Sequence, residues 1–148
     1  MASRILTTNY SQRNLFVWNN RYNSIPLVYT NSSGSEVALL KGMIIGRIAA
    51  SGLAKQSVST ATDGSQIPIG ILTEDVTIAN GESANLTICI QGDVDYGMLV
   101  YGGSPADTIA SKIYTDAGAA YLGTYGDLLN GLGVLPIVTT ENTYVDNQ

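Results

Sequence analysis

The side chains that could perform catalysis in this 148-residue chain are few, because the sequence contains no histidine. Ser-His-Asp and Cys-His nucleophiles are therefore excluded, and so are zinc or iron sites built on imidazole. The single cysteine, Cys89, lies in an alternating pattern typical of a strand, which predicts a small buried side chain and not a nucleophile. A Ser-x-x-Lys pair, a phosphate-binding loop and a complete dinucleotide fingerprint are also absent.

Carboxylate pairs are the remaining chemical option. Glu74-Asp75 and Asp93-Val-Asp95 could serve a glycosidase or hold calcium, since both chemistries use acidic side chains. The second pair, however, does not complete a calcium loop, which needs further oxygen ligands and a late glutamate. Both pairs flank predicted turns, where solvated acids are ordinary. We therefore predict no catalytic residue, no metal and no cofactor.

Charge is distributed unevenly along the chain. Residues 1–35 contain three arginines and no acidic residue, whereas the remainder contains four basic and twelve acidic residues. This imbalance is either a chance feature of a short segment or the mark of a basic arm that docks on an acidic surface. The formal net charge of −5 argues against nucleic acid as a partner, because phosphate binding needs clustered basic side chains.

Targeting signals are not recognisable in the sequence. No continuous apolar run approaches the roughly 20 residues that a membrane-spanning helix needs, so no membrane partner is expected. Residues 1–10 lack the apolar segment of a secretory signal. We therefore expect synthesis in the cytoplasm without export by the usual route.

The best-defined elements lie between Asp63 and Leu99. Asn80-Gly81 is a pair typical of a tight turn. After it, residues 86–91 alternate, with leucine or isoleucine at every even position, and this period of two predicts a strand. Residues 67–71 alternate likewise, but a proline and a glycine occupy the opposite face. That pattern predicts either an edge strand or the close approach of another backbone.

Weaker patterns predict the remaining elements. Residues 43–49 and 134–138 are expected to form strands, and residues 51–65 an exposed polar loop. Ser104-Pro-Ala-Asp107 combines a helix N-cap, a proline at the first helical position and an early acid, and apolar residues follow at helical spacing. The main helix is therefore expected over residues 104–117, with Gly118 or Gly123 as its stop, and a brief helical turn is expected at 127–130, closed by Gly131.

Tyrosine is strongly preferred over phenylalanine, with nine residues against one. Tyrosine combines apolar area with a polar tip, which suits a partly wet interface, although half-buried core positions explain the choice equally well. We treat the tyrosines that gather within thirty residues as a candidate subunit interface. They are Tyr96, Tyr101, Tyr114, Tyr121 and Tyr125.

Several motifs, taken in order, resemble the lambda D-like head decoration proteins of tailed bacteriophages. They are Lys41-Gly-Met-Ile-Ile-Gly46, the "DG…GIL" stretch of Asp63–Leu72, Gly92-Asp-Val94 followed by Leu99, and Gly131-Leu-Gly-Val-Leu-Pro-Ile-Val138. The resemblance covers about residues 39–138. Residues 51–62, the tyrosine-rich stretch after Gly102 and the polar C-terminal tail depart from the family pattern.

The resemblance implies a small β-rich α/β domain with mixed and antiparallel strands and one main helix, preceded by an extended arm that orders on binding. It implies a homotrimer in the virion, on the outer capsid surface, that binds the major capsid protein and cements the shell. The corresponding division of the chain is an arm at 1–35, a domain at 36–139 and a polar tail at 140–148. Extended pieces are expected at 15–18 and 25–29. The candidate capsid-binding residues of the arm are Arg4, Arg13, Leu15, Phe16, Trp18 and Arg21.

Two rival functions remain open at this stage. One is the base of a head fibre or another minor virion protein, which would occur at lower copy number. The other is a carbohydrate-binding module, which would normally use aromatic platforms on the folded domain, whereas the only tryptophan lies in the predicted arm. An enzyme is the least favoured class, because no catalytic signature supports it.

Overall fold

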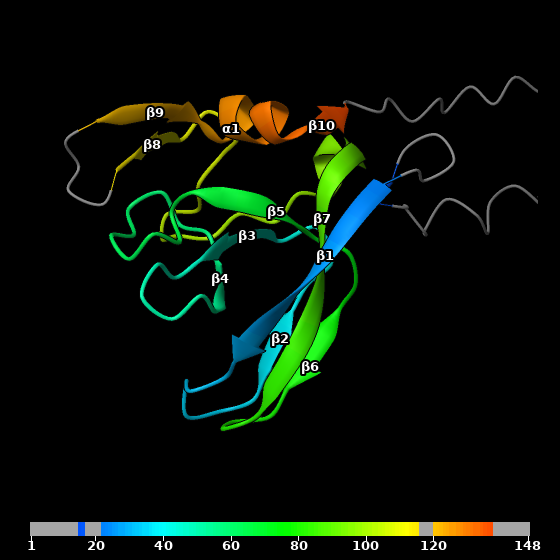
Figure 1. The fold of residues 1–148 in the computed structure, drawn as a ribbon, viewed down its shortest axis with the longest axis vertical. Coiled ribbons are helices and arrows are strands. Elements are labelled where there is room, and N and C mark those ends of the chain that lie inside the picture. Colours follow the sequence, from blue (N-terminus) through cyan, green and yellow to red (C-terminus); the bar gives the residue numbers. More distant parts are fainter. Residues whose placement is uncertain (1–14, 17–21, 116–119, 138–148) are drawn as a thin grey trace, which may run out of the picture.

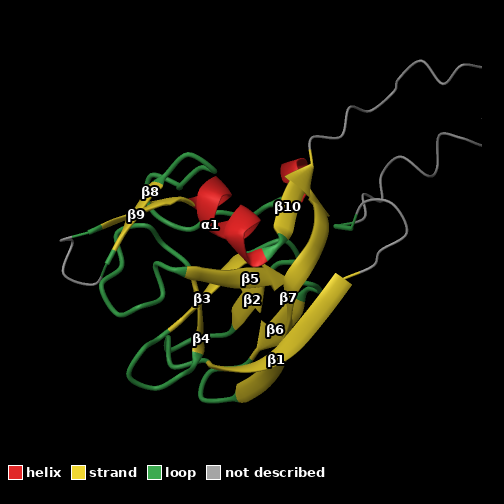
Figure 2. Ribbon diagram, turned by 45° about the horizontal axis from the view of Figure 1, so that its top comes forward, coloured by secondary structure: helices red, strands yellow, loops and turns green. Residues whose placement is uncertain are grey.

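The computed structural model of the chain describes residues 15–16, 22–115 and 120–137. Within these residues one α-helix lies against a mostly antiparallel sheet (Figures 1 and 2), which confirms the expected β-rich α/β fold class. The elements are β1 (Tyr22–Thr30), β2 (Val37–Leu39), β3 (Ile44–Arg47), β4 (Ala54–Gln56), β5 (Pro68–Leu72), β6 (Val76–Ile78), β7 (Ser83–Asp95), the one-turn 3₁₀ helix η2 (Tyr96–Met98), β8 (Lys112–Tyr114), β9 (Tyr121–Thr124), α1 (Tyr125–Leu132) and β10 (Val134–Ile137).

The large sheet is organised around β7, the longest strand described. Its strand order is β1-β7-β5-β3-β4, and β10 pairs in parallel with the C-terminal end of β7. Two small sheets, β2-β6 and β8-β9, complete the body. In Figure 1, β2 and β6 lie at the lower end of the long strands, whereas β8, β9, α1 and β10 form the upper layer. Figure 2 shows α1 above β5 and beside β10.

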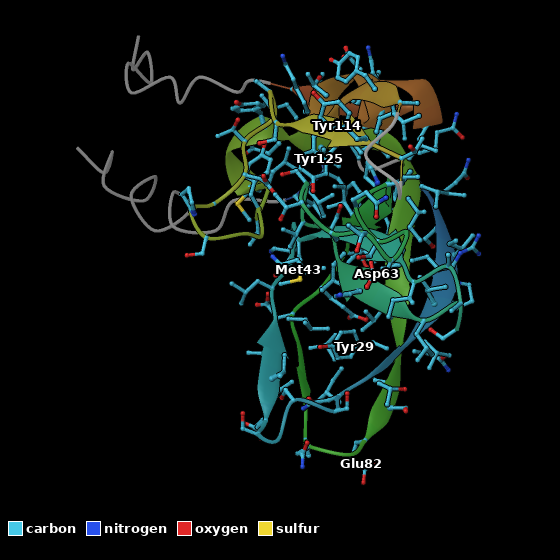
Figure 3. All side chains as sticks on the ribbon, turned by 90° about the vertical axis from the view of Figure 1, so that its left-hand side faces the viewer. Tyr29, Met43, Asp63, Glu82, Tyr114 and Tyr125 are labelled. Carbon is cyan, nitrogen blue, oxygen red and sulfur yellow. The ribbon has the colours of Figure 1, made fainter. Side chains whose placement is uncertain are left out.

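Two apolar clusters form the core, one on each side of the large sheet. The helix-side cluster contains Leu15, Ile44, Ile71, Cys89, Val94, Leu99, Ile113, Tyr125, Leu129 and Val134. The lower cluster contains Leu39, Met43, Ile45, Ala54, Leu72, Ile78, Leu86 and Ile88, and Tyr29 packs against it at the labelled position in Figure 3.

β7 contributes to both clusters because its side chains alternate between the two faces of the sheet. Leu86 and Ile88 enter the lower cluster and Cys89 enters the helix-side cluster, which confirms the predicted alternation and the buried cysteine. A bulge after Cys89 then adds one residue to β7 relative to β1. Since one extra residue reverses the faces of a strand, the even-numbered Val94 lies in the helix-side cluster.

The proline-glycine pattern of β5 reflects a close approach of backbones and not an edge position. β5 has β3 on one side and β7 on the other. A methyl group at Gly70 would lie 2.2 Å from the carbonyl oxygen of Cys89 on β7, so only glycine fits. The edge-strand alternative is therefore wrong.

The helix expected over residues 104–117 is wrong. Residues 102–111 form a series of turns and residues 112–114 form β8. The Asp107 carboxylate, which was expected to sit near a helix start, instead accepts hydrogen bonds from the backbone and side chain of Ser59. Ile113 is buried between the exposed Lys112 and Tyr114. These three residues therefore alternate as in a strand and do not follow the predicted helical spacing.

The α-helix that forms, α1, extends in both directions beyond the turn expected at 127–130. Thr124 and Asp127 make a capping box at its N-terminus, each accepting a hydrogen bond from the backbone N–H of the other. The helix ends at Gly133, whose φ of 92° is readily available only to glycine, and not at Gly131.

Candidate functional site

The apolar anchors predicted in the arm, Leu15 and Phe16, are held by the folded body. Leu15 is 2% exposed, and its carbonyl accepts a hydrogen bond of 2.7 Å from the backbone N–H of Asp95. Phe16 forms an antiparallel bridge with Val94. Its ring stacks on Tyr22, with 3.9 Å between the ring centroids and 2° between the planes. In this structure the two side chains are therefore part of the body.

The rest of the predicted arm divides between the body and the residues that the structure leaves undescribed. Residues 22–30 form β1, which pairs with β7 along its whole length, and residues 25–29 are extended as expected. Apolar side chains of β1 pack against the lower cluster. Arg4, Arg13, Trp18 and Arg21 lie outside the described residues.

The two ends of the described body meet at the C-terminal end of β7. Val94 has Phe16 on one side and Pro136 of β10 on the other. Neighbouring strands lie about 4.8 Å apart, so Phe16 and Pro136 are separated by roughly 10 Å. The segments that precede Leu15 and follow Ile137 therefore start from the same place on the body.

Two of the five candidate interface tyrosines are core residues. Tyr125 is 1% exposed, and its hydroxyl forms a hydrogen bond of 2.9 Å with the side chain of Ser57. Tyr101 packs against the same helix-side cluster, with its ring centroid 6.3 Å from that of Tyr125. Burial raises the pKa of both phenols to about 12, so neither ionises near neutral pH.

The other three tyrosines are exposed. Tyr96 is 38% exposed on η2, and Tyr114 and Tyr121 are 40% and 55% exposed on the β8-β9 hairpin. The rings of Tyr114 and Tyr121 lie 5.6 Å apart with their planes inclined at 53° (Tyr114 is labelled in Figure 3). Their exposed faces make the hairpin suited to a contact with another protein surface.

One carboxylate of each pair accepts a hydrogen bond from the backbone at a turn. The Asp75 carboxylate accepts a hydrogen bond of 2.7 Å from the backbone N–H of Lys41, and Asp95 accepts one of 2.9 Å from Gly97 at the start of η2. The described ranges contain no group of three or more acidic, cysteine or histidine side chains that could hold a metal ion. In the same ranges, no helix combines the length and apolar character that crossing a lipid bilayer requires.

The expectation of an exposed loop at residues 51–65 is wrong in part, because β4 (Ala54–Gln56) lies within this range and its Ala54 is buried. Ser57 and Ser65 are buried, as is the following Gln66. The Ser57 hydroxyl bonds to Gln66 O as well as to the Tyr125 hydroxyl, which ties the loop to α1. Polar composition alone predicted exposure; these groups are buried because hydrogen bonds satisfy them.

An ion pair closes the same loop. Lys55 Nζ lies 2.7 Å from Asp63 Oδ2, and the Asp63 carboxylate also accepts hydrogen bonds from Ser65. The bond from Lys55 and then the bond from Ser65 hold the pKa of Asp63 well below its usual range. The Lys55–Asp63 ion pair therefore stabilises the closed loop, and we assign no catalytic role to Asp63.

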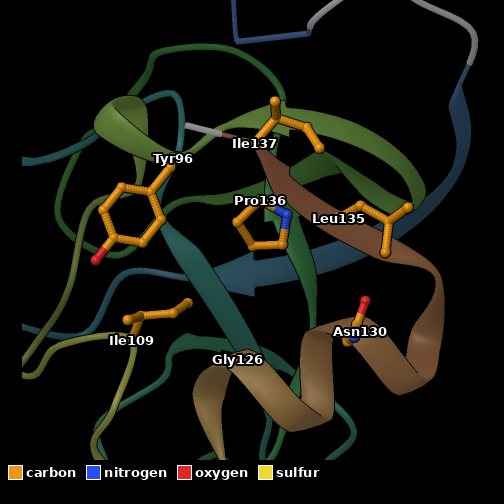
Figure 4. A pocket seen from close by; sticks show the side chains of 7 residues that line it. All are labelled: Tyr96, Ile109, Gly126, Asn130, Leu135, Pro136 and Ile137. Carbon is orange, nitrogen blue, oxygen red and sulfur yellow. The ribbon is translucent and has the colours of Figure 1, made fainter. Parts of the chain in front are cut away.

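An open groove beside β10 is the site that sequence reasoning missed. It has a volume of about 450 Å³, and none of the described residues that line it carries a charge (Figure 4). The walls come from β10, α1, η2 and the loop before β8, so no local sequence motif marks the site. The one sign in the sequence was Pro136, because a proline inside a predicted strand indicates an edge strand. The lining residues include Tyr96, Ile109, Asn130, Leu135, Pro136 and Ile137.

Comparison with known families matches the region that builds this body. A sequence model of the family described as bacteriophage lambda head decoration protein D matches residues 28–121, which is more than half of the chain. A comparison with curated proteins gives no match. The matched residues begin within β1 and end at the start of β9, so they include all of β2 to β8. The chain therefore belongs to the bacteriophage lambda head decoration protein D family, whose members are structural proteins of the phage head.

Proposed function

We propose that this protein binds the outer surface of a bacteriophage capsid and cements the shell of the major capsid protein. The observation that carries the proposal is the family match over residues 28–121. The low content of charged residues, 13%, also supports it, because a surface built mainly from uncharged polar groups loses little hydration when it packs against neighbours. After synthesis in the host cytoplasm, the protein would become part of the virion.

We propose that the segment that precedes Leu15 binds the capsid and that Trp18 and Arg21 make further contacts with it. The sequence from residue 1 to residue 35 has three arginines and no acidic residue, and arginine offers bidentate hydrogen bonds to carboxylates. The hydrogen bond to Asp95 and the bridge to Val94 give this segment a fixed starting point. An extended segment can add a strand to an exposed sheet edge of a capsid subunit. Ordering it costs roughly 1–2 kcal/mol per residue, which contacts with the shell must offset.

We further propose that the protein acts as a homotrimer whose subunits meet through the exposed tyrosines. We assign this contact to the Tyr114–Tyr121 pair, which supplies two exposed rings at the surface of the β8-β9 hairpin, and not to Tyr96, which lies on η2. Exposed tyrosine is enriched in protein interfaces. Tyr101 and Tyr125 have no part in this contact, since both pack against or within the core.

The test is binding to purified shells that lack the protein. The truncation should delete residues 2–14 and keep Leu15, because a deletion through residue 30 would also remove β1 from the large sheet. The full chain should co-sediment with shells and raise their melting temperature, whereas the truncated chain should stay folded and unbound. Deletion of residues 140–148 is the matched control and should leave binding unchanged.

Other outcomes would identify the rival functions. Full occupancy by the chain without residues 2–14 would contradict the role of the arm. A density reconstruction with few copies per capsid, or with a fibre on each copy, would favour a head-fibre base. Glycan binding by the full chain, with no binding to shells, would favour a carbohydrate-binding module.

A further inference from the structure

The groove beside β10 has the chemistry of a docking site for apolar side chains. Leu135, which is 39% exposed, Pro136 and Ile137 line it from β10, and Tyr96 and Ile109 line it from other segments; in Figure 4 the Pro136 ring lies between Tyr96 and Leu135. Asn130 and the Tyr96 hydroxyl are the polar groups among the lining side chains named above. A charged group placed here would lose hydration without gaining an ionic partner, so an apolar occupant is favoured.

The edge of β10 limits how that occupant can bind. The backbone N–H of Gly92 donates to the carbonyl of Gly133 at 3.0 Å. In a parallel ladder this register turns the backbone groups of Leu135 toward β7 and those of Val134 and Pro136 away from it. Pro136 has no N–H, so a strand laid along this free edge would lack a hydrogen bond at its centre. The occupant must therefore be recognised through side chains and not as an added strand.

The groove lies next to the base of the arm. Pro136 and Phe16 flank Val94 from opposite sides, roughly two strand spacings or 10 Å apart. A partner that binds the segment before Leu15 is thus brought to the groove by the same encounter. Two contacts made together raise the overall affinity through effective concentration.

We propose that the groove receives an apolar turn or loop of the capsid subunit, as a second contact that works together with the arm. This inference rests on the proposed capsid-binding function. The partner presents uncharged side chains that pack against Leu135, Ile137 and Tyr96. The arm binds parts of the shell that the body does not touch, and the groove fixes the orientation of the body on the shell.

The experiment compares matched leucines in the full chain. Leu135→Ser removes an exposed leucine from the groove, and Leu40→Ser removes one, 48% exposed, from the turn between β2 and β3. Fully burying a leucine stabilises by about 1.5–3 kcal/mol, but Leu135 is only 39% exposed, so docking can gain about two fifths of this, or ~0.6–1.2 kcal/mol. We expect Leu135→Ser to weaken binding to undecorated shells by roughly three- to eightfold and Leu40→Ser to leave it unchanged. Tyr96→Ser, on η2, should weaken it as well and serves if Leu135→Ser does not fold.

A photocrosslinking residue at position 135 identifies the occupant directly. Crosslinks to the major capsid protein support the proposal. Crosslinks only to a second copy of this chain, together with a changed oligomeric state of Leu135→Ser, would assign the groove to self-association and overturn it. Normal shell binding by both groove variants would also overturn it, while leaving the proposed function intact. Failure of the unmodified chain to bind shells would instead contradict the proposed function itself.

Discussion

At the scale of single residues, the packing of the folded body depends on a few positions where adding or removing a single atom would disturb it. Gly70 is the clearest case, because the carbonyl oxygen of Cys89 occupies the space of a β-carbon. Ser57 and Gln66 are another, since they carry polar groups into the interior and bond with each other. Amino-acid composition does not reveal such residues, yet they determine how closely the strands and loops approach one another.

Gly70→Ala should destabilise the protein by about 1–3 kcal/mol, because the added methyl group meets backbone that cannot rotate away. Chemical denaturation followed by far-ultraviolet circular dichroism measures this change. Gly131→Ala is the matched control, since nothing lies within 4 Å of a β-carbon there. In α1 this control should be neutral or stabilising by up to about 1 kcal/mol. Equal destabilisation by both variants would contradict the close-approach explanation.

Asp63 should make stability depend on acid. Its pKa is lower in the folded protein than the value of about 3.9 expected for an unfolded chain, so its contribution is present above that pH and is lost as the pH falls further. Solvent keeps the effect modest, since the Lys55 and Asp63 side chains are 47% and 34% exposed. Urea titrations between about pH 5 and pH 2 should show a shallower loss of stability for Asp63→Asn than for the unmodified chain.

At the scale of elements, the main lesson concerns where the arm ends. Leu15 and Phe16 pack on the end of β7, where Phe16 makes an isolated bridge, and β1 pairs with β7 beside them. The sequence pattern placed all of these residues in one arm, because it contains no sign of pairing between residues that are far apart in the chain. The family match, which begins at residue 28, likewise starts inside β1.

Leu15→Ala should destabilise the folded body by about 2–4 kcal/mol, as expected for a leucine in the helix-side cluster. An arm residue without contacts to the body would give a change near zero. Amide exchange gives a second measure, because loss of this packing should speed exchange at Asp95, whose N–H donates to Leu15. Arg13→Ala is the control outside the described residues and should leave the unfolding free energy unchanged.

Patterns with a period of two predicted the strands well, and the helix failed for a physical reason. Residues 86–91 alternate as predicted because β7 buries both of its faces in different clusters. Asp107 does accept hydrogen bonds, as a helix-capping acid would. Its donor, however, is Ser59, which lies 48 residues away in the sequence and not in a helix that begins at Ser104. The groove could not be predicted, since four segments contribute its walls and only the fold brings them together.

At the scale of the whole molecule, the two contacts that we propose lie at different places on the body. The β8-β9 hairpin carries the exposed tyrosine pair, whereas the groove and the base of the arm lie at the end of β7. Separate surfaces allow self-association and capsid binding to be tested independently.

Tyr121→Ser should weaken self-association at least about tenfold if the tyrosine pair is an interface hot spot. Light scattering after size exclusion, over a range of concentrations, measures the change. Leu40→Ser removes an exposed apolar side chain elsewhere and should leave the oligomer intact. An unchanged trimer in the Tyr121 variant would place the subunit interface on another surface, and a monomeric unmodified chain would contradict the trimer altogether.

The pairing of β7 with strands from both ends of the chain has a consequence for biosynthesis. Leu15 is made early and Val134 late, yet both pack into the helix-side cluster. Contacts between residues so far apart in sequence form slowly, since loop closure must come first. A nascent chain that stops before β10 leaves the end of β7 without its parallel partner and the helix-side cluster without Val134. The body can therefore close only after the chain has been translated through β10.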